Sequence, residues 1–338
     1  MATASPMPAR PRRKGWRIAI IAIGAIVLLV AGAAGVFAWS LSNTFNSQTT
    51  KLPDAFPSEE SGRPAILEGE AAKSQNILLL GSDTTGENDG SIADLTGQRS
   101  DAIMVVHVPA NRKNIYVMSI LRDSWLDIPG EGEEAKINAA LSLGGVPLAV
   151  QTVEGLLGTR IDHVAIIDFE GFKGVTDALG GVDIDNPIAF DSYHLKGHYF
   201  PEGAQRVNGA EALAFVRERY AFADGDFQRA RNQQVFIKAV LGKTLSAETL
   251  TSPGKVSGLI GAVAPFLAVD DGLNAAYAAG IGVELRDVRV DDVTFFTLPT
   301  TGTGTSPDGQ SIVIIDQDKL TGVQKAFQTD TLDEYQPE

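Results

Sequence analysis

The sequence predicts an α/β fold, an α-β-α sandwich around a mixed central sheet, preceded by one transmembrane helix. Three observations predict it. After residue 74, short runs rich in Ile, Val and Leu alternate with longer helical stretches. Those runs are continuously apolar, which is typical of strands that helices cover on both faces. Residues 18–39 carry no charge. Strands interleaved with helices are typical of layered α/β domains.

The uncharged segment at residues 18–39 is long enough to cross a membrane, because about 20 helical residues span the hydrocarbon core. Every charge before it is basic. These residues are Arg10, Arg12, Arg13, Lys14 and Arg17. Positive charge marks the cytoplasmic side, so residues 1–17 are expected to be a cytoplasmic tail and the rest extracytoplasmic. The competing interpretation is a cleaved signal peptide, whose apolar region is usually about 7–15 residues. In both cases the following domain is exported.

Residues 40–73 read as an extracytoplasmic stalk. They are mostly small or polar, include Pro53, Pro57 and Pro64, and show no periodic apolar face. A short stalk would hold the next domain, expected at residues 74–330, close to the outer leaflet.

The expected elements of that domain follow in order. Strands are expected at residues 76–80, 102–108, 115–121, 163–168, 293–298 and 311–315. Helices are expected at residues 138–157, 169–179, 209–216, 227–245 and 253–283, with a last one from residue 317. Gly144, Gly145 and Pro147 should interrupt the first helix. Residues 300–309, rich in Thr and Gly, are expected to be a flexible loop, and residues 331–338 a flexible tail.

Charge and cysteine content exclude several functions. The chain has 28 Lys and Arg, and the 23 that follow the basic tail face 42 Asp and Glu. Such a surface repels nucleic acid, whose binding depends on neutralising phosphates with Lys and Arg. The chain has no Cys, which excludes disulfides, thiolate chemistry and Cys-ligated zinc. His194 and His198 alone have a metal-like spacing, and they sit in a polar stretch that makes a poor zinc site.

A cluster of arginines stands out in this acidic chain. Arg217, Arg219, Arg229 and Arg231 lie close together, with Asp226 among them. Arg229 and Gln233 are four residues apart and share one helix face. Arg217 and Arg219 can converge only where the backbone is extended or turning. Guanidinium forks bind phosphate oxygens bidentately, so converging arginines suggest a ligand with several negative charges, such as a pyrophosphate. The alternative is a solvated, salt-bridged helix face.

A second set of charges lies at the expected strand ends. Asp83 ends the first strand, Arg99 and Asp101 lead into the second, and Arg122 and Asp123 end the third. Ligands of α/β sheets bind at this edge. Asp83 and Asp101 could hold Mg²⁺, which commonly takes one or two carboxylates and completes its shell with phosphate and water. The alternative is that each Asp is a turn or cap residue.

These spaced motifs resemble those of the LytR-CpsA-Psr family of cell-wall polymer ligases. The matching segments are residues 76–83 (NILLLGSD), 99–106 (RSDAIMVV), 119–130 (SILRDSWLDIPG), 136–138 (KIN), 168–182 and 209–234 (GAEALAFVRERYAFADGDFQRARNQQ). The resemblance covers roughly residues 75–330. Three residues depart from it: Leu121 replaces a usual Pro, Phe215 a common Tyr, and Asn232 a frequent Arg.

The resemblance implies a phosphotransferase that moves a glycan phosphate from a polyprenyl-pyrophosphate carrier to a peptidoglycan or other wall hydroxyl. It implies that Asp83 and Asp101 bind Mg²⁺ and that Asp226 orders the arginines. The pyrophosphate ligands it implies are Arg99, Arg122, Arg217, Arg219, Arg229 and Gln233, with Lys136 as a further contact. Asp101 or Asp123 would accept the hydroxyl proton. An apolar lipid pocket inside the domain would hold the prenyl chain, since each buried CH₂ contributes about 0.8 kcal/mol.

Two other functions remain open on the sequence alone. A polyprenyl-pyrophosphate hydrolase would use the same site with water as the nucleophile. A non-enzymatic polyprenyl-binding or regulatory protein of the cell envelope would bind the lipid without turnover. The sequence leaves the donated glycan and the oligomeric state open.

Overall fold

A computed structural model describes residues 35–82, 100–250 and 252–335. Its described residues fall into two units that divide between Asn43 and Thr44. Of the expected membrane helix at 18–39, residues 18–34 lie outside the described part of the chain, and residues 35–48 are helical. The larger unit contains the expected domain.

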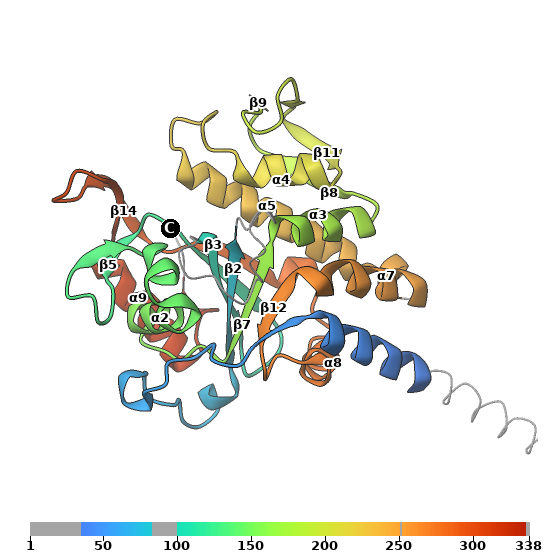
Figure 1. Cartoon of the computed structure of the whole chain (residues 1–338), viewed down its shortest axis with the longest axis horizontal. Helices are drawn as coiled ribbons and strands as arrows, with labels where there is room; N and C mark the ends of the chain where they lie inside the picture. The colour runs from blue at the N-terminus through green and yellow to red at the C-terminus, as the bar shows by residue number, and fades with distance from the viewer. Residues whose placement is uncertain (1–34, 83–99, 251, 336–338) are drawn as a thin grey trace, which may run out of the picture. The chain divides into compact units, whose positions relative to one another are not determined.

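Seven of the described strands form a mixed central sheet in the order β1-β12-β7-β2-β3-β4-β13 (Figure 1). They are β1 (Thr50–Leu52), β2 (Gln75–Ser82), β3 (Ser100–Val108), β4 (Ile115–Ile120), β7 (His163–Asp168), β12 (Leu267–Asp270) and β13 (Val293–Thr297). β2 pairs in parallel with β7 and antiparallel with β3, and β3 pairs antiparallel with β4. The expected mixed α/β fold is therefore confirmed.

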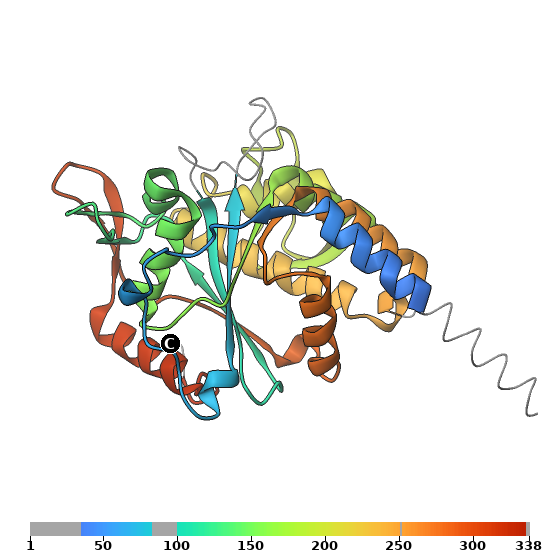
Figure 2. The same ribbon diagram turned by 60° about the horizontal axis from the view of Figure 1, so that its bottom comes forward.

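Helices lie on both faces of this sheet (Figures 1 and 2). One face carries α2 (Ala139–Leu157) and α9 (Gln317–Thr329); the other carries α3 (Phe169–Ala178), α4 (Gly209–Arg217), α5 (Asp226–Thr244) and α7 (Pro253–Val263). Side chains of β4 alternate between the faces: Met118 packs in the core with α2, and Val117 packs with Leu241 of α5. Cover on both sides explains why the strands read as continuous apolar runs.

The remaining elements are short and flank these layers. They are β5 (Trp125–Asp127), β6 (Glu134–Lys136), β8 (Val182–Asn186), β9 (Phe190–Asp191), β10 (Tyr199–Phe200), β11 (Gly203–Val207), β14 (Thr300–Thr305), β15 (Ser311–Ile315), α6 (Ala247–Leu250), α8 (Ala275–Glu284) and four 3₁₀ turns, η1 (Glu60–Gly62), η2 (Ala71–Lys73), η3 (Ala264–Phe266) and η4 (Val290–Asp292). β8 and β11 pair antiparallel and pack with α4 and α5 around a second apolar cluster that includes Phe200 and Phe215.

Two elements differ from the sequence prediction. The apolar stretch 253–283, expected to be helical, contains β12, whose Ala268 and Val269 are fully buried between β1 and β7. A short apolar strand and a buried helix segment look alike in sequence. Residues 300–309, expected to be a flexible loop, contain β14, which pairs antiparallel with β15. Thr is a good strand former, and the partner strand supplies the hydrogen bonds.

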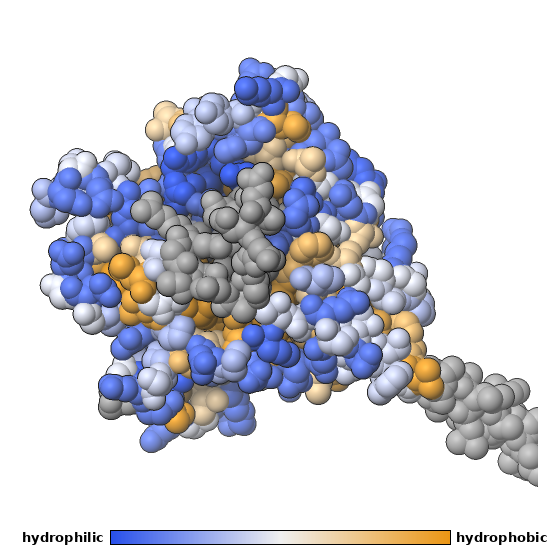
Figure 3. Space-filling view, in the orientation of Figure 1, coloured by the Kyte–Doolittle hydropathy of each residue, from blue (hydrophilic) through white to orange (hydrophobic). Residues whose placement is uncertain are grey.

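The α2 helix is broken where expected. Gly144 and Gly145 leave helical geometry, and Gly145 has a φ of 64° with a ψ of −158°, a conformation that favours Gly. Among the described helices, α2 alone is long and apolar enough to cross a membrane by length and composition, and 56% of that window is buried inside the domain. The face shown in Figure 3 is predominantly hydrophilic among the described residues, with apolar residues in small patches.

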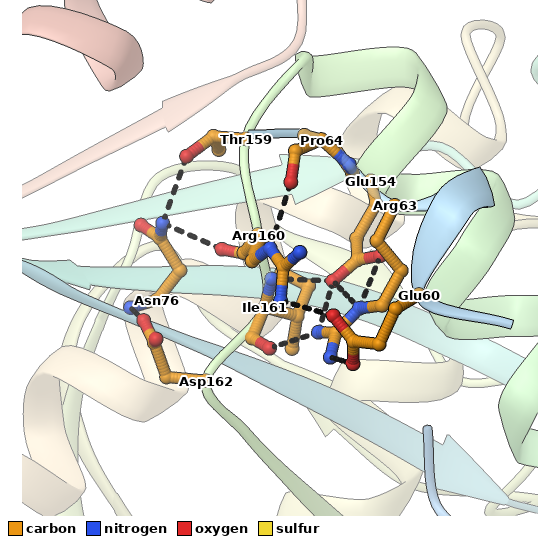
Figure 4. A network of polar contacts seen from close by, with 9 residues as sticks. All are labelled: Glu60, Arg63, Pro64, Asn76, Glu154, Thr159, Arg160, Ile161 and Asp162. Atoms are coloured by element: carbon orange, nitrogen blue, oxygen red, sulfur yellow. Dashed lines mark hydrogen bonds and ion pairs between the residues drawn. The ribbon is translucent and has the colours of Figure 1, made fainter. Parts of the chain in front are cut away.

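The segment expected to be a stalk is part of the domain from Thr44 onward. β1 joins the central sheet beside β12, and Ala55 is buried. Arg63 forms an ion pair with Glu154 of α2, Nη2 to Oε1 at 2.5 Å, and the Glu154 carboxylate is completely buried (Figure 4). A buried carboxylate needs such a partner. At the other end of the chain, Leu332, in the expected flexible tail, is buried in the main core.

Replacing Arg63 with Ala should lower the free energy of unfolding by about 3–5 kcal/mol, because the buried Glu154 carboxylate loses its cation. Chemical denaturation of the full-length chain in detergent measures this loss. Lys73→Ala is the matched control: Lys73 pairs with Glu70 on the same segment, but both side chains are exposed, so about 0–1 kcal/mol is expected. Equal stabilities of the two variants would contradict the conclusion that Arg63 fastens this segment to the domain through Glu154.

Candidate active site

The first half of the site lies at one edge of the central sheet. Ser82 at the end of β2 pairs with Ser100 at the start of β3, and Ile120 at the end of β4 pairs with Ile103. This register brings Asp101 and Arg122 to the same edge, where Arg122 Nη1 donates to the Asp101 carboxylate. The ion pair joins two strand ends that are 21 residues apart in the chain.

The second half comes from the connection between α4 and α5. α4 ends at Arg217, and Glu218 has an extended conformation with φ −64° and ψ 127°. An extended residue sends its neighbours to the opposite side, so Arg217 and Arg219 face one cavity while the Glu218 carboxylate is buried on the other side. Arg217 and Arg219 were expected to converge only on an extended or turning backbone, and the extended Glu218 provides it.

One cavity of about 240 Å³, here called the amphipathic cavity, receives both halves. Its charged and amide lining is Asp101, Arg122, Arg217, Arg219, Arg229 and Gln233. Its apolar lining is Leu79, Leu80, Ala102, Met104, Ile167, Phe172, Leu213, Val216, Phe236 and Ile237. A ligand with an anionic head and an apolar tail matches these two kinds of lining.

Asp226, the first residue of α5, holds the arginines together. Its carboxylate lies 3.2 Å from Arg229, 3.4 Å from Arg122 and 3.5 Å from Arg219. Burial raises the pKa of Asp226, but Arg229 and Arg122 outweigh burial and hold the pKa below its ordinary value. Burial lowers the pKa of Arg229 in spite of Asp226, and Arg still stays charged. The excess of guanidinium groups over carboxylates favours an anion in the cavity.

A second hollow, here called the polar pocket, adjoins the amphipathic cavity and shares Arg122, Arg219 and Tyr220 with it. It measures about 890 Å³ and reaches the hairpin of β14 and β15. Asp123 and Lys136 line it and form an ion pair at 3.3 Å.

Asp123 has the environment of a proton acceptor. Burial raises its pKa, the neighbouring Asp226 raises it further, and Arg122 and Lys136 only partly oppose the shift. A carboxylate whose pKa is raised towards neutrality is a better general base. Asp101 differs in its location, because it lines the amphipathic cavity, where its carboxylate pairs with Arg122, and it does not line the polar pocket.

The predicted site residues fall into three groups. Asp101, Arg122, Arg217, Arg219, Arg229 and Gln233 line the amphipathic cavity; Asp123, Lys136 and Asp226 line the polar pocket; Asp83 and Arg99 lie outside the described residues. Lys136 thus faces the polar pocket rather than the amphipathic cavity. Arg231 is turned outward and pairs with Asp224, so it does not replace the Arg that the family often has at position 232.

The three departures from the family pattern are all buried. Leu121 packs with Ala230 and Val313, and Phe215 lies in the second apolar cluster. Asn232 donates from Nδ2 to the Phe215 carbonyl at 3.1 Å and accepts from Gln228 Nε2 at 2.9 Å. The departures therefore change supporting contacts and leave the charged lining intact.

Sequence reasoning missed His194 and Tyr220, which line the amphipathic cavity. His194 donates through Nε2 to the Arg217 carbonyl at 3.2 Å, and burial together with Arg217 lowers its pKa. Tyr220 follows Arg219 directly, so its position next to a predicted phosphate ligand could have identified it as a site residue from the sequence. His194 lies 23 residues from Arg217, and its contact depends on the fold.

The fit to a magnesium ion can be judged at Asp101 alone. Its partly exposed carboxylate lies at the cavity, beside the arginines, and is the type of ligand that Mg²⁺ prefers. Within the described ranges, no group of three or more His, Asp or Glu side chains is arranged to hold a metal. Mg²⁺ commonly needs only one or two carboxylates when phosphate and water complete its shell, so Asp101 fits.

Comparison with known proteins gives consistent matches. The model of the LytR_cpsA_psr family matches residues 36–329. The polyisoprenyl-teichoic acid–peptidoglycan teichoic acid transferase TagU of Bacillus mycoides is 33% identical over 236 residues, which cover 69% of this chain and 73% of TagU. The crystal structure of B. subtilis TagV superposes with a TM-score of 0.65 and 27% identity, covering 78% of this chain and 99% of TagV. A structure of TagT bound to LI-WTA superposes with a TM-score of 0.60 and 26% identity, and the match covers 80% of this chain and 96% of the TagT chain.

Replacing Asp226 with Asn should lower the free energy of unfolding by about 3–5 kcal/mol near neutral pH, because the buried Arg229 loses its counter-charge. The pKa of Asp226 is depressed in the folded chain, so its contribution is complete above its ordinary pKa of about 3.9 and is lost as pH falls through the lower folded value. Denaturation at neutral and acidic pH measures both effects.

Asp224→Asn is the control for this change. Asp224 also pairs with an arginine of α5, but both side chains are nearly half exposed, so a loss of about 0–1 kcal/mol is expected. A deficit for the Asp226 variant that does not shrink as the pH is lowered would contradict the role of its charge.

Proposed function

The chain belongs to the LytR-CpsA-Psr family, and on that premise we propose that it transfers a glycan phosphate from a polyprenyl-pyrophosphate carrier to a hydroxyl of peptidoglycan or another wall polymer. The observation that carries this proposal is the amphipathic cavity, in which arginines and an apolar lining meet. TagU of B. mycoides is named for a polyisoprenyl-linked donor and a peptidoglycan acceptor, which supports the same classes of substrate here.

The two linings of the cavity match the two parts of such a donor. Arg122, Arg217, Arg219 and Arg229 suit the oxygens of a pyrophosphate, because guanidinium forks bind phosphate bidentately. The apolar residues suit the prenyl chain, since each buried CH₂ contributes about 0.8 kcal/mol. Arg99, outside the described residues, would add to the phosphate ligands, and Lys136 would contribute charge from the polar pocket.

The reaction follows from where the charges lie. The oxygen of the acceptor hydroxyl forms a bond to the phosphorus that carries the glycan. The bond from that phosphorus to the bridging oxygen breaks, and the polyprenyl phosphate leaves with the bonding electrons. The arginines stabilise the charge on both phosphates, and such electrostatic stabilisation is the main task in phosphoryl transfer.

The proton of the acceptor hydroxyl goes to Asp123 in this proposal. Asp123 lies in the polar pocket with a raised pKa, whereas Asp101 lies in the amphipathic cavity beside Arg122. Asp101, with Asp83, would hold Mg²⁺. When bound, that ion supplies further positive charge for the phosphate oxygens. Residues 18–39 would anchor the chain in the cell membrane, with residues 1–17 in the cytoplasm and the catalytic domain outside, within reach of a lipid-borne donor.

Transfer by the full-length chain in detergent tests the proposed function. The donor is a short-chain prenyl pyrophosphate that carries a disaccharide, and the acceptor is purified peptidoglycan. We expect a Mg²⁺-dependent product that chelation with EDTA abolishes. Arg219→Ala should lower the rate by about 10²–10³-fold, the usual effect of removing one group that stabilises developing charge.

Arg231→Ala is the matched control, because Arg231 is turned away from the cavity and pairs with Asp224; it should keep the full rate. Full activity of folded Arg219→Ala would overturn the arginine site. Release of free glycan phosphate at the same rate without acceptor would instead identify a hydrolase, and the absence of any turnover would overturn an enzymatic role.

The pH profile of transfer tests Asp123. The rate should fall as pH drops through the raised pKa of Asp123, because the protonated carboxyl cannot accept a proton. Asp123→Asn should lower the rate by about 10²–10⁴-fold and remove this acidic limb. Asp127→Asn, an exposed Asp four residues further on, should keep both the rate and the limb. An unchanged limb in Asp123→Asn would assign the proton to another group.

A further inference from the structure

Two exposed tyrosines beside the arginines have no part in the proposed reaction. The side chains of Tyr193 and Tyr220 are 64% and 59% exposed, and their ring centroids are 4.6 Å apart. Tyr220 lines both the amphipathic cavity and the polar pocket, so its ring lies where the two hollows meet, with the Tyr193 ring packed against it. Single exposed aromatic residues are common on protein surfaces, but two tyrosine rings packed together at an interplanar angle of 49° beside two pockets are not explained by chance exposure.

The two rings come from segments far apart in the chain, and Glu218 fixes them. Its fully buried carboxylate accepts from the backbone N–H of Tyr193 at 2.7 Å and from that of Tyr220 at 3.0 Å. The same carboxylate accepts from the N–H of Arg219 at 3.1 Å. Glu218 is therefore a positioning residue that sets the backbone under both rings and under Arg219.

The side chains around the rings restrict them further. Arg219 Nη2 donates to Tyr220 Oη at 2.8 Å, and its guanidinium carbon lies 4.6 Å from the Tyr220 ring centroid. The His194 ring meets the Tyr193 ring edge to face, with centroids 5.6 Å apart. These contacts hold the two rings in place before any ligand arrives, and such preorganisation reduces the entropy that binding would otherwise lose.

The ligand chemistry follows from the neighbouring groups and rests on the proposed function. If the apolar lining takes the prenyl chain and the arginines take the pyrophosphate, the next chemical group in a donor is a sugar, and the attacking group is a sugar hydroxyl. A pyranose has a face of C–H groups and a rim of hydroxyls. The negative face of an aromatic ring attracts the C–H groups, and the Tyr hydroxyl offers a hydrogen-bonding partner for the rim.

We propose that Tyr193 and Tyr220 form a stacking platform that binds a sugar ring next to the pyrophosphate site. The sugar can belong to the donor or to the acceptor, because both must approach the same phosphorus. The same chemistry would recognise a donor sugar and an acceptor sugar. For a donor sugar the rings affect the affinity for the donor, and for an acceptor sugar they affect the KM for the acceptor.

Three variants of the full-length chain in detergent test the platform: Tyr193→Ala, Tyr220→Ala and Tyr220→Phe. Tyr199→Ala is the matched control, since Tyr199 is 55% exposed on neighbouring β10 but, unlike Tyr193, is not paired among the described residues with a ring that lines the hollows. Two probes are compared by titration: geranylgeranyl pyrophosphate, and the same lipid pyrophosphate carrying an N-acetylated disaccharide. Peptidoglycan fragments serve as the acceptor in transfer assays.

For a donor sugar, the Ala variants should weaken binding of the disaccharide probe about 10-fold more than binding of the bare probe, which matches the usual strength of aromatic contacts. For an acceptor sugar, both probes should bind normally while the KM for the peptidoglycan fragments rises about 10-fold. Tyr220→Phe should keep most of the affinity that Tyr220→Ala loses, because Phe keeps the ring and loses only the contacts of the hydroxyl, including the bond to Arg219.

Two results would overturn the platform while leaving the proposed function in place. One is normal binding of both probes and an unchanged acceptor KM in the Ala variants. The other is equal weakening of both probes, with Tyr220→Phe as weak as Tyr220→Ala, because the ring would then only hold Arg219. If the wild-type chain fails to bind geranylgeranyl pyrophosphate, the proposed function itself is overturned.

Discussion

Like charges repel, and this domain gathers four guanidinium groups around one cavity. The Asp226 carboxylate makes that possible by contacting Arg122, Arg219 and Arg229 at once. Two carboxylates, Asp226 and Asp101, cannot neutralise four cations, so the cavity keeps an excess of positive charge in a chain whose net charge is −14. An anion with several charged oxygens is the natural complement, and the rest of the structure serves to hold these groups in place.

The supports for the cluster come from opposite directions. The sheet fixes Asp101 and Arg122 through strand register, while α5 fixes Arg229 through its first turn. Gln234 ties α5 to the sheet, because its Nε2 donates to Ser119 Oγ at 2.9 Å and to the Phe296 carbonyl at 3.1 Å. On α5, Gln233 therefore faces the cavity, while the next residue, Gln234, anchors the helix to the sheet.

Glu218 illustrates the same division on the α4 side. It lies between Arg217 and Arg219 in the chain, yet its carboxylate is buried and binds no guanidinium group of the described residues. It accepts instead from backbone N–H groups of the loop at residues 219–221 and of Tyr193. A charge that looks like part of an exposed Arg-Glu-Arg run is in fact an internal support. The buried Arg63–Glu154 pair has a comparable supporting role, because it fastens the segment that leads in from the N-terminus to α2.

The sequence by itself determined the mixed α/β class, the strands β2, β3, β4 and β7, and the shared helix face of Arg229 and Gln233, because these depend on local hydrophobic runs and on spacing. It left open whether Arg217 and Arg219 converge with them, and the extended conformation of Glu218 decided that. Only the tertiary structure decided that residues 267–270 and 300–305 are strands, that the segment after Thr44 docks on the sheet, and that Tyr193 meets Tyr220. The physical reason is that periodicity reports the burial of a residue among its chain neighbours. Strand pairing, buried ion pairs and ring contacts depend on partners tens to hundreds of residues away, and those partners come into contact only once the chain has folded.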